Sequence, residues 1–574
     1  MSEDTPDLPR YHWNVKPVQT PSTDTPPGVS GIVLSILGGR GITGAERISE
    51  FLSPVLSRLN SPFMFADMER AAARVADAVL GKENVCIYGD YDADGMTSTA
   101  LMKLYLSGLG LEARTFIPDR ETDGYGLHTS RIDEIGATGV TLIVCVDCGI
   151  KSTEAALHAA ASGIDLVILD HHLPGDELPK AHAIVDPHRA DCGFPFKNLA
   201  AVGIVFYFCG ALRRALSERG VSGMPDVRDF LDLVAIGTVA DVMPLIGDNR
   251  ILVKAGIDRI NSRPRPGIAA LKAIAGCRGP ITASSISFRM APRLNASGRM
   301  SSPDNSLNLL LSGDDRSAAT WAEHLELAND HRREVEMALT NEARRQIMDA
   351  GGLDAKAVVV SGHGWHNGVL GIVASRLVEE FRVPAIVLSI DDDGTASGSA
   401  RSVEGFDIGA ALAGLERMLL RTGGHPMAAG LALDVARLDE FTTAFKAVAD
   451  LCVGERGAAR NLDVDLFVDL DVVDTELVRQ IQLLEPFGTG NPEPILAVSG
   501  AEVVQTRRVG RDADHLKLSL RQKGTLVDGI WFGAGQSGLC EGELVDVAFN
   551  VGRDGMTGAV SIRVRDARPA QRPS

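Results

Sequence analysis

Carboxylate and imidazole side chains recur at the ends of apolar runs between residues 88 and 242 of this chain. They lie in the segments YGDYDADG (88–95), VCVDCGI (144–150), LDHH (169–172) and TVADV (238–242). Oxygen-rich sites with one or two imidazoles suit Mn²⁺ or Mg²⁺. Two such ions can activate a water and stabilise the attacking and leaving oxygens of a phosphoryl displacement. The segments therefore predict a two-metal site that hydrolyses a phosphoester.

The first three of these segments each follow an aliphatic run that is typical of a strand buried on both faces, at residues 85–88, 142–146 and 166–169. Helical stretches at 96–109 and 153–162 separate the runs. This β-α-β-α-β order predicts a parallel sheet with right-handed crossovers. Because ligands bind at the carboxyl ends of such strands, one sheet edge should carry Asp92, Asp94, Asp147, Asp170, His171 and His172.

Other motifs carry less weight. The run Gly39-Arg40-Gly41-Ile42-Thr43-Gly44 matches a dinucleotide fingerprint, but no suitable acidic residue follows it about 20 positions later. We interpret it as a turn between two helices. Cys145 and Cys148 form a C-x-x-C pair without the second pair that a zinc site needs. Neither motif predicts a cofactor.

The metal-ligand segments resemble those of the DHH phosphoesterase superfamily. Further segments resemble the RecJ family of bacterial single-stranded-DNA exonucleases, and they follow the family order from about residue 40 to 570: PHRADCGFPFKNLAAVG (187–203), APRLNASGRM (291–300), GWHNGVLGIVASRL (364–377), SGSARS (397–402), GGHPMAAG (423–430) and EPFGTGNPEPIL (485–496). The resemblance implies a single-stranded-DNA-specific exonuclease that releases 5′-mononucleotides in the 5′→3′ direction.

The same resemblance implies roles for the metal-site residues. Two ions, Mn²⁺ or Mg²⁺, are expected, with Asp92 on the first, Asp94 on the second and Asp147 bridging both. His171 and Asp241 would complete the second ion's shell, and Asp90 would add to the first. The expected catalytic residues are Asp147, Asp170 and His172, with His172 beside the scissile phosphate. Tyr88 stands where other branches of the superfamily place a histidine, which leaves the last ligand of the first ion open.

Six further residues are expected to contact the substrate. Arg299 and its neighbours lie in an arginine-dense motif, and Arg401 lies among small residues that let a phosphate approach closely. By contrast, the pairs Arg332/Arg333 and Arg344/Arg345 lie on an expected helix and are typical of a solvated face. The expected substrate-binding set is Arg293, Asn295, Arg299, Ser399, Arg401 and His425.

The predicted fold class is α/β with a C-terminal barrel. We expect an N-terminal extension (1–45), a parallel-sheet catalytic domain (46–310), a connecting helix (314–350), a second α/β domain (353–455) and an OB-fold (461–570). The OB-fold is predicted from five short β-like runs at 501–505, 516–521, 526–531, 544–550 and 561–564. Trp531 and Phe532 face opposite ways on a strand, so at most one stacks on a base.

Composition is consistent with an enzyme of the cytoplasm. The chain has 574 residues, eight scattered cysteines and no 18-residue uncharged apolar span, so no membrane association is expected. Its net charge of −18 is unusual for a nucleic-acid enzyme. Several of the acids are expected metal ligands, however, and two divalent ions would return about four positive charges locally.

Partners and alternatives follow from the same comparison of motifs. The resemblance implies a monomer that acts in DNA recombination and mismatch repair, with single-stranded DNA as substrate and single-strand-binding protein and a helicase as partners. One alternative is a phosphodiesterase of short oligonucleotides or cyclic dinucleotides. The other is a non-catalytic scaffold that keeps the fold and has lost metal ligands.

Overall fold

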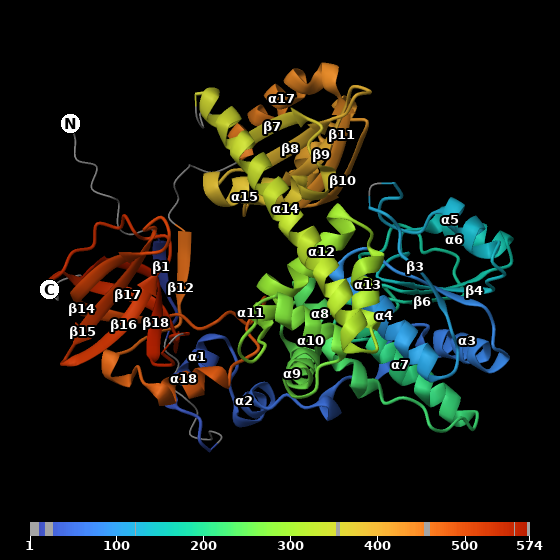
Figure 1. The fold of residues 1–574 in the computed structure, drawn as a ribbon, viewed down its shortest axis with the longest axis horizontal. Helices are drawn as coiled ribbons and strands as arrows, with labels where there is room; N and C mark the ends of the chain where they lie inside the picture. Colours follow the sequence, from blue (N-terminus) through green and yellow to red (C-terminus); the bar gives the residue numbers. More distant parts are fainter. Residues whose placement is uncertain are drawn as a thin grey trace. The chain divides into compact units, whose positions relative to one another are not determined.

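The computed structural model describes residues 11–17, 27–120, 122–351, 356–452, 460–555 and 557–570. The chain divides into two compact units (Figure 1). Unit 1 comprises residues 1–58, 244–246 and 458–574, and unit 2 comprises residues 59–243 and 247–457. Each unit has its own hydrophobic core, so each is described by itself.

The first sheet of unit 2 is parallel and has the strand order β3-β2-β4-β5-β6. Its strands are β2 (Val85–Tyr88), β3 (Arg114–Phe116), β4 (Leu142–Val146), β5 (Asp165–Leu169) and β6 (Ala183–Val185). Every side chain of β2 and β4 is buried, as the continuous aliphatic runs predict. The predicted parallel sheet is therefore confirmed, and β2, β4 and β5 end side by side.

Helices surround this sheet and continue beyond it. The helix after β2 begins at Ala93, three residues before the predicted start, because Asp92 caps it. The α-helices from residue 68 to 349 are α3 (Met68–Gly81), α4 (Ala93–Gly108), α5 (Thr129–Gly136), α6 (Thr153–Ala161), α7 (Ala201–Glu218), α8 (Leu231–Ala240), α9 (Gly247–Ser262), α10 (Pro266–Ile274), α11 (Ala283–Ser285), α12 (Ala291–Met300), α13 (Asp304–Leu311) and α14 (Asp315–Asp349). The predicted connecting helix is α14.

A second, mixed sheet completes unit 2, with the order β10-β11-β9-β8-β7. It contains β7 (Val358–His363), β8 (Ala385–Ile390), β9 (Thr395–Arg401), β10 (Arg421–His425) and β11 (Ala428–Asp434), with α15 (Asn367–Phe381), α16 (Ile408–Ala413) and α17 (Leu438–Cys452). Leu339, Ala343 and Ile347 of α14 are buried in one core with Val369 and Val373 of α15. Figure 1 shows α14 running from the helices near α12 to this sheet.

Unit 1 is built on a closed barrel in which β14 pairs with both β15 and β17. The barrel strands are β14 (Leu496–Val509), β15 (His515–Gln522), β16 (Thr525–Trp531), β17 (Leu544–Arg553) and β18 (Val560–Pro569), with β12 (Arg460–Val464), β13 (Leu466–Phe467) and α18 (Thr475–Gln482) before them. All five predicted barrel strands are confirmed. Trp531 lies in the core, whereas Phe532 is exposed and meets the His515 ring edge to face.

Of the predicted N-terminal extension (1–45), residues 11–17 and 27–45 are described, and residues 1–10 and 18–26 lie outside the described residues. Strand β1 (Tyr11–Val15) pairs in parallel with β12, and the Trp13 indole donates to Asp566 Oδ2 over 2.8 Å. Helices α1 (Gly31–Gly39) and α2 (Ala45–Leu52) add Val33, Ile36 and Ile48 to the barrel core. Strand β1 and helix α1, which lie within the predicted N-terminal extension (1–45), thus bury Trp13, Val33 and Ile36 in the cores of unit 1.

Three smaller features of the fold concern the sequence motifs and composition. The glycine-rich residues 39–44 do join α1 to α2, as expected for a turn. All eight cysteines are free thiols. Within the described ranges, no helix is long and apolar enough to cross a membrane.

Candidate metal centre

The carboxyl ends of three adjacent strands place acidic side chains at one sheet edge. Asp90 follows β2, Asp147 follows β4, and Asp170 follows β5. Tyr88 is in register with Cys145, and Cys145 with Ile168, so the three strands end at nearly the same level. Asp147 has a left-handed backbone (φ 65°), which turns the chain at the end of β4. The side chains predicted at this edge are therefore brought together there.

Two more carboxylates come from the start of α4. Asp92 caps this helix by accepting hydrogen bonds from the Asp94 and Gly95 amides over 2.9 and 3.1 Å. Asp94 lies in the first turn and accepts from the Ala201 and Val202 amides at the start of α7 over 2.7 and 3.0 Å. Both carboxylates are thus fixed by helix N-termini, which favour negative charge.

The last carboxylate of the group, Asp241, ends helix α8. Helix α8 packs tightly on α4, since a Cβ at Gly237 would lie 2.8 Å from Asp94 Oδ1 and 2.3 Å from Thr97 Oγ1. Only glycine fits at this contact. The close packing brings Asp241 to the sheet edge from a segment about 70 residues after His171.

His171 lies among these carboxylates. Its Nε2 lies 3.2 Å from Asp147 Oδ1 and 3.8 Å from Asp241 Oδ2. Sets of ligand atoms within 4.8 Å of one another are Asp90/Asp92/Asp147, Asp94/His171/Asp241 and Asp147/His171/His172. The first two sets are the ligands expected for two separate ions, and Asp147 also belongs to the third.

Several of these groups have unsatisfied polar atoms. Asp90 Oδ1, Asp147 Oδ1 and Asp241 Oδ2 are buried and make no hydrogen bond to any described residue. Burial and then neighbouring carboxylates raise the pKa of Asp94 to about 7 and that of Asp241 to about 9, and raise those of Asp90 and Asp147 well above the ordinary value. Buried carboxylates without partners are costly unless a cation neutralises them. The donor set therefore fits divalent cations that prefer oxygen ligands.

Burial also keeps His171 ready to act as a ligand. It lowers the pKa of this histidine to about 4, which leaves the imidazole neutral. A neutral imidazole nitrogen is the form that binds metals. The His188 ring bonds to the His171 backbone.

Asp170 has a different environment from the other acids. Its Oδ1 accepts from the His171 and His172 amides and from His172 Nδ1, and its Oδ2 accepts from the Ile150 amide over 3.0 Å. Although burial acts to raise the pKa of Asp170, the bond from His172 and the nearby histidines lower it to about 2. Asp170 is thus an ionised carboxylate whose oxygens are occupied, and it orients His172 rather than facing the ligand sets.

His172 is oriented through its Nδ1 atom. This atom lies 2.8 Å from Asp170 Oδ1 and 3.0 Å from the Tyr125 hydroxyl. Burial acts to lower the pKa of His172, but the bond to Asp170 raises it above the ordinary value. Because Nδ1 is held by Asp170, Nε2 is the atom left to meet a substrate. Tyr125, which belongs to the loop after β3, was not among the predicted residues.

Replacing Asp170 with Asn should lower kcat by about a hundredfold, the upper effect typical of a group that orients a site residue. Asn offers one acceptor oxygen for four donors, so His172 would lose its fixed orientation. Hydrolysis of the expected single-stranded-DNA substrate would measure the loss of kcat. The Mn²⁺ concentration that gives half-maximal activity should be nearly unchanged. A large loss of metal affinity with normal kcat at saturating metal would contradict this assignment.

Arginine side chains gather next to this metal centre. Arg299 on α12 donates to the Gly368 carbonyl over 2.8 Å, and burial followed by the charges of Arg120 and Arg332 lowers its pKa to about 10. Burial and the charge of Arg120 also lower the pKa of Arg401 on β9. None of Arg120, Arg299 and Arg401 forms an ion pair with a described residue. Like charges crowded without acidic partners fit an anionic ligand.

Two further arginines near Arg299 were not predicted to lie beside the metal centre. Arg120, in the loop after β3, lies 5.0 Å over the Tyr91 ring. Arg332 was expected on a solvated face, but it is largely buried, pairs with Glu336 over 2.6 Å, and adds to the charge around Arg299. A single arginine in a loop or on a long helix gives no local signal of such a neighbourhood.

The other predicted substrate residues are placed differently. Arg293 is buried in a two-pronged ion pair with Glu326 and also donates to the Arg289 carbonyl. Asn295 accepts from the Ala93 amide over 2.7 Å and so supports the start of α4. Ser399 lies on β9 close to Arg401, and His425 is exposed at the end of β10. Asn295 and Arg293 thus have internal partners, whereas Ser399 and His425 remain available to a ligand.

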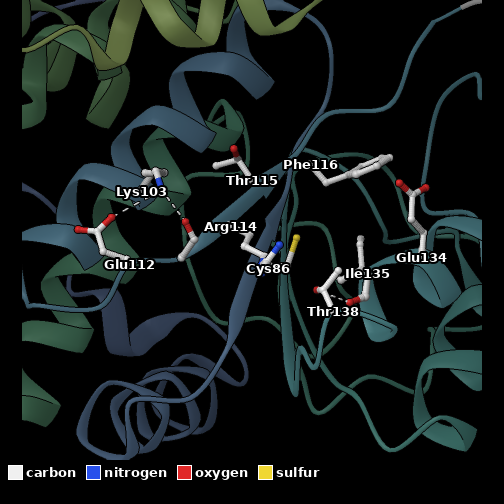
Figure 2. Close-up of a pocket in the computed structure, with 10 residues that line it drawn as sticks. Cys86, Lys103, Glu112, Arg114, Thr115, Phe116, Glu134, Ile135 and Thr138 are labelled. Carbon is white, nitrogen blue, oxygen red and sulfur yellow. Dashed lines mark hydrogen bonds and ion pairs between the residues drawn. The ribbon is translucent and has the colours of Figure 1, made fainter.

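A hollow of about 610 Å³ at the β3 edge of the first sheet is a separate feature (Figure 2). Lys103 donates to the Ala113 carbonyl there and lies 3.8 Å from Glu112. Burial raises the pKa of the Cys86 thiol to about 12, so this thiol is not reactive. None of the metal-centre residues lines this hollow.

Comparisons with known proteins cover most of the chain. Residues 84–238 match the DHH family, N-terminal domain, residues 354–450 the DHHA1 domain, and residues 464–566 the RecJ OB domain. Single-stranded-DNA-specific exonuclease RecJ of Bacillus subtilis is 37% identical over 90% of this chain and 65% of its own length, and the Escherichia coli protein of that name is 36% identical over 89% and 90%.

Solved structures agree with these sequence matches. RecJ of Thermus thermophilus in complex with Mn²⁺ has a TM-score of 0.81, 30% identity, and coverage of 98% of this chain and 80% of its own. The same protein with Mg²⁺ has a TM-score of 0.75, 28% identity, and coverage of 98% and 79%. The predicted succession of parallel-sheet domain, second α/β domain and OB barrel is thereby confirmed. The chain belongs to the RecJ family.

Proposed function

We propose that this protein is a metal-dependent exonuclease that degrades single-stranded DNA from the 5′ end and releases 5′-mononucleotides. The observation that carries the proposal is the set of three buried carboxylate oxygens without a hydrogen bond, on Asp90, Asp147 and Asp241, near Arg120, Arg299 and Arg401, which form no ion pair with a described residue. Relatives that match about nine tenths of this chain are named single-stranded-DNA-specific exonucleases. A role in recombination and repair follows from this activity.

In this proposal the ligand sets hold two ions. Asp90, Asp92 and Asp147 would hold the first and Asp94, His171 and Asp241 the second, and Asp147, whose Oδ1 lies 3.2 Å from His171 Nε2, would serve both. Mn²⁺ or Mg²⁺ suits these oxygens, and both metals are present in structures of the Thermus relative. When bound, two such ions activate water and neutralise charge on the reacting phosphate. No side chain is required as a covalent nucleophile.

The protein's own groups orient the phosphodiester. His172, held by Asp170 through Nδ1, directs Nε2 at a non-bridging oxygen or at the leaving group. The backbone amides at the starts of α4 and α7 fix Asp92 and Asp94, so the ligand positions are preorganised before substrate arrives.

The arginines Arg120, Arg299 and Arg401 would bind the 5′-terminal phosphate of the strand. Arg299 and Arg401 are retained from the sequence analysis, Arg120 is added, and Ser399 and His425 are further donors on the same sheet. Arginine is suited to this role by its forked donors. Arg293 is not assigned to phosphate binding, because its guanidinium group already donates two hydrogen bonds to the Glu326 carboxylate.

Replacing Arg401 with Ala should raise KM for a 5′-phosphorylated strand by about tenfold to a hundredfold, the loss of a charge-assisted hydrogen bond of about 1.5–3 kcal/mol. The variant should also lose its preference for 5′-phosphate over 5′-hydroxyl ends. Arg344→Ala is the matched control, because Arg344 is exposed and paired with Glu380. An unchanged end preference in Arg401→Ala would exclude this residue from phosphate binding.

The activity itself can be tested with end-labelled DNA. Mn²⁺-dependent release of mononucleotides from the 5′ end of a single strand, with little release from a blunt duplex, is the expected result. Rapid cleavage of dinucleotides without attack on long strands would instead place the enzyme among short-substrate phosphodiesterases. Absence of metal-dependent cleavage would favour a non-catalytic scaffold.

Further proposals concern the cellular setting. We expect a cytoplasmic monomer that is recruited to DNA by single-strand-binding protein and works with a helicase. We also assign residues 46–310 to the catalytic domain apart from α2, 353–455 to a substrate-binding domain and 461–570 to a nucleic-acid-binding barrel. Co-purification with single-strand-binding protein and a mass measurement in solution would test these points.

A further inference from the structure

Helix α8 ends in an unusual turn immediately after the metal-centre residue Asp241. The Val242 amide bonds to the Val239 carbonyl and the Met243 amide to the Thr238 carbonyl, both over 3.2 Å. This pair of bonds defines a Schellman turn, whose left-handed position is normally glycine. Here that position is Val242, with a φ of 59°.

A valine is poorly suited to this backbone. Its branched Cβ clashes with the neighbouring carbonyl in the left-handed region, where glycine, asparagine and aspartate are tolerated. The other non-glycine residues with positive φ in the described ranges are not β-branched: Asp67, Lys82, Asp147, Arg382, Ala513 and Lys523. Val242 is therefore the one β-branched side chain held in this conformation there, and strained residues of this kind gather at functional sites.

Packing does not explain why a valine occupies this position. Its side chain is 63% exposed, so it contributes little to the core. The preceding residue, Asp241, has its Oδ2 only 3.8 Å from His171 Nε2. An exposed apolar residue in a strained turn thus follows a residue of the ligand sets immediately in the chain.

We propose that Val242 contacts the deoxyribose that flanks the scissile phosphate and so helps to position the strand. This inference rests on the proposed nuclease function. A phosphate held at the ligand sets carries sugar carbons as its nearest apolar neighbours, so a branched apolar group beside Asp241 meets a sugar before a base. A glycine at this position would relieve the strain and lose that contact.

Val242→Asn tests the contact because asparagine accepts the left-handed backbone but is polar. The expected result is about a three- to tenfold rise in KM for a single strand, the loss of one partly buried apolar contact. The unfolding temperature should not fall, and the Mn²⁺ midpoint should not change. Val242→Leu, which keeps an apolar side chain, should have a KM closer to that of the wild type than Val242→Asn has.

A matched control is Lys82→Asn, which changes another left-handed residue at a helix end, before β2 and so at the opposite end of the sheet. It should leave KM unchanged. An unchanged KM in Val242→Asn, or an equal loss in Val242→Leu, would overturn the inference. A shifted Mn²⁺ midpoint would also overturn it, since Val242 would then act through Asp241. If wild type did not hydrolyse single strands, the proposed function and this inference would fail together.

Discussion

Replacing Asp147 with Ala should lower exonuclease kcat by at least about a thousandfold, which corresponds to about 4 kcal/mol of transition-state stabilisation. Asp147 belongs to the ligand set of Asp90 and Asp92, and its Oδ1, buried without a hydrogen bond, lies 3.2 Å from Nε2 of His171, a member of the second ion's set. Its removal would therefore weaken both proposed ions at once. Quenched-flow release of mononucleotides at saturating Mn²⁺ would measure kcat, and equilibrium dialysis would count the ions that remain bound.

Asp186→Asn is the matched control for this prediction. Asp186 follows β6, is fully buried, and accepts from the His188 amide over 2.6 Å. Burial, and then the charge of Asp170, raise its pKa to about 8, so it is neutral at pH 7 and similar to asparagine. This variant should keep near wild-type kcat. Wild-type activity in Asp147→Ala, or equal losses in both variants, would contradict the assignment of Asp147 as a shared ligand.

The contribution of Asp94 and Asp241 to the stability of the metal-free protein should fall as the pH rises from about 4 to about 9. Folded-state pKa values of about 7 for Asp94 and about 9 for Asp241 lie above the unfolded value of about 3.9. The folded state therefore binds more protons than the unfolded state in this window. The stabilising effect of the bound protons is complete below the unfolded pKa and is lost as the pH passes through the folded values.

Metal should reverse this trend because the ions replace the protons. At about a thousand times its dissociation constant, a ligand of the folded state adds about 4 kcal/mol to the free energy of unfolding. Thermal unfolding with EDTA and with Mn²⁺, at about pH 6 and about pH 8.5, should show a larger metal-induced rise at the higher pH. Asp241→Asn should reduce this rise. An equal rise at both pH values would contradict proton displacement at these carboxylates.

The part of the metal centre that lies at the ends of the parallel strands was predictable from the sequence. The aliphatic runs at 85–88, 142–146 and 166–169 predict parallel strands, and carboxyl ends of parallel strands share an edge, so the meeting of Asp147, Asp170 and His171 follows. The segment of Asp241 was part of the pattern, but its role on the second ion came from the resemblance, since its position depends on the close packing of α8 on α4 at Gly237.

The substrate residues were less predictable because partners distant in sequence decide their roles. Arg293 and Arg299 share one motif, yet Arg293 pairs with Glu326 from α14, whereas Arg299 has no acidic partner among the described residues. Tyr125 reaches His172 from a loop whose path no local pattern indicates. The apolar run of α1 was visible, but its packing partners begin more than 400 residues later.

The most direct test of the two-ion account is anomalous diffraction from crystals of the protein soaked in Mn²⁺. The account predicts two manganese peaks roughly 3.5–4 Å apart. One peak should adjoin Asp90 and Asp92, the other Asp94, His171 and Asp241, and Asp147 should contact both. A single peak, or two peaks that do not share Asp147, would contradict it.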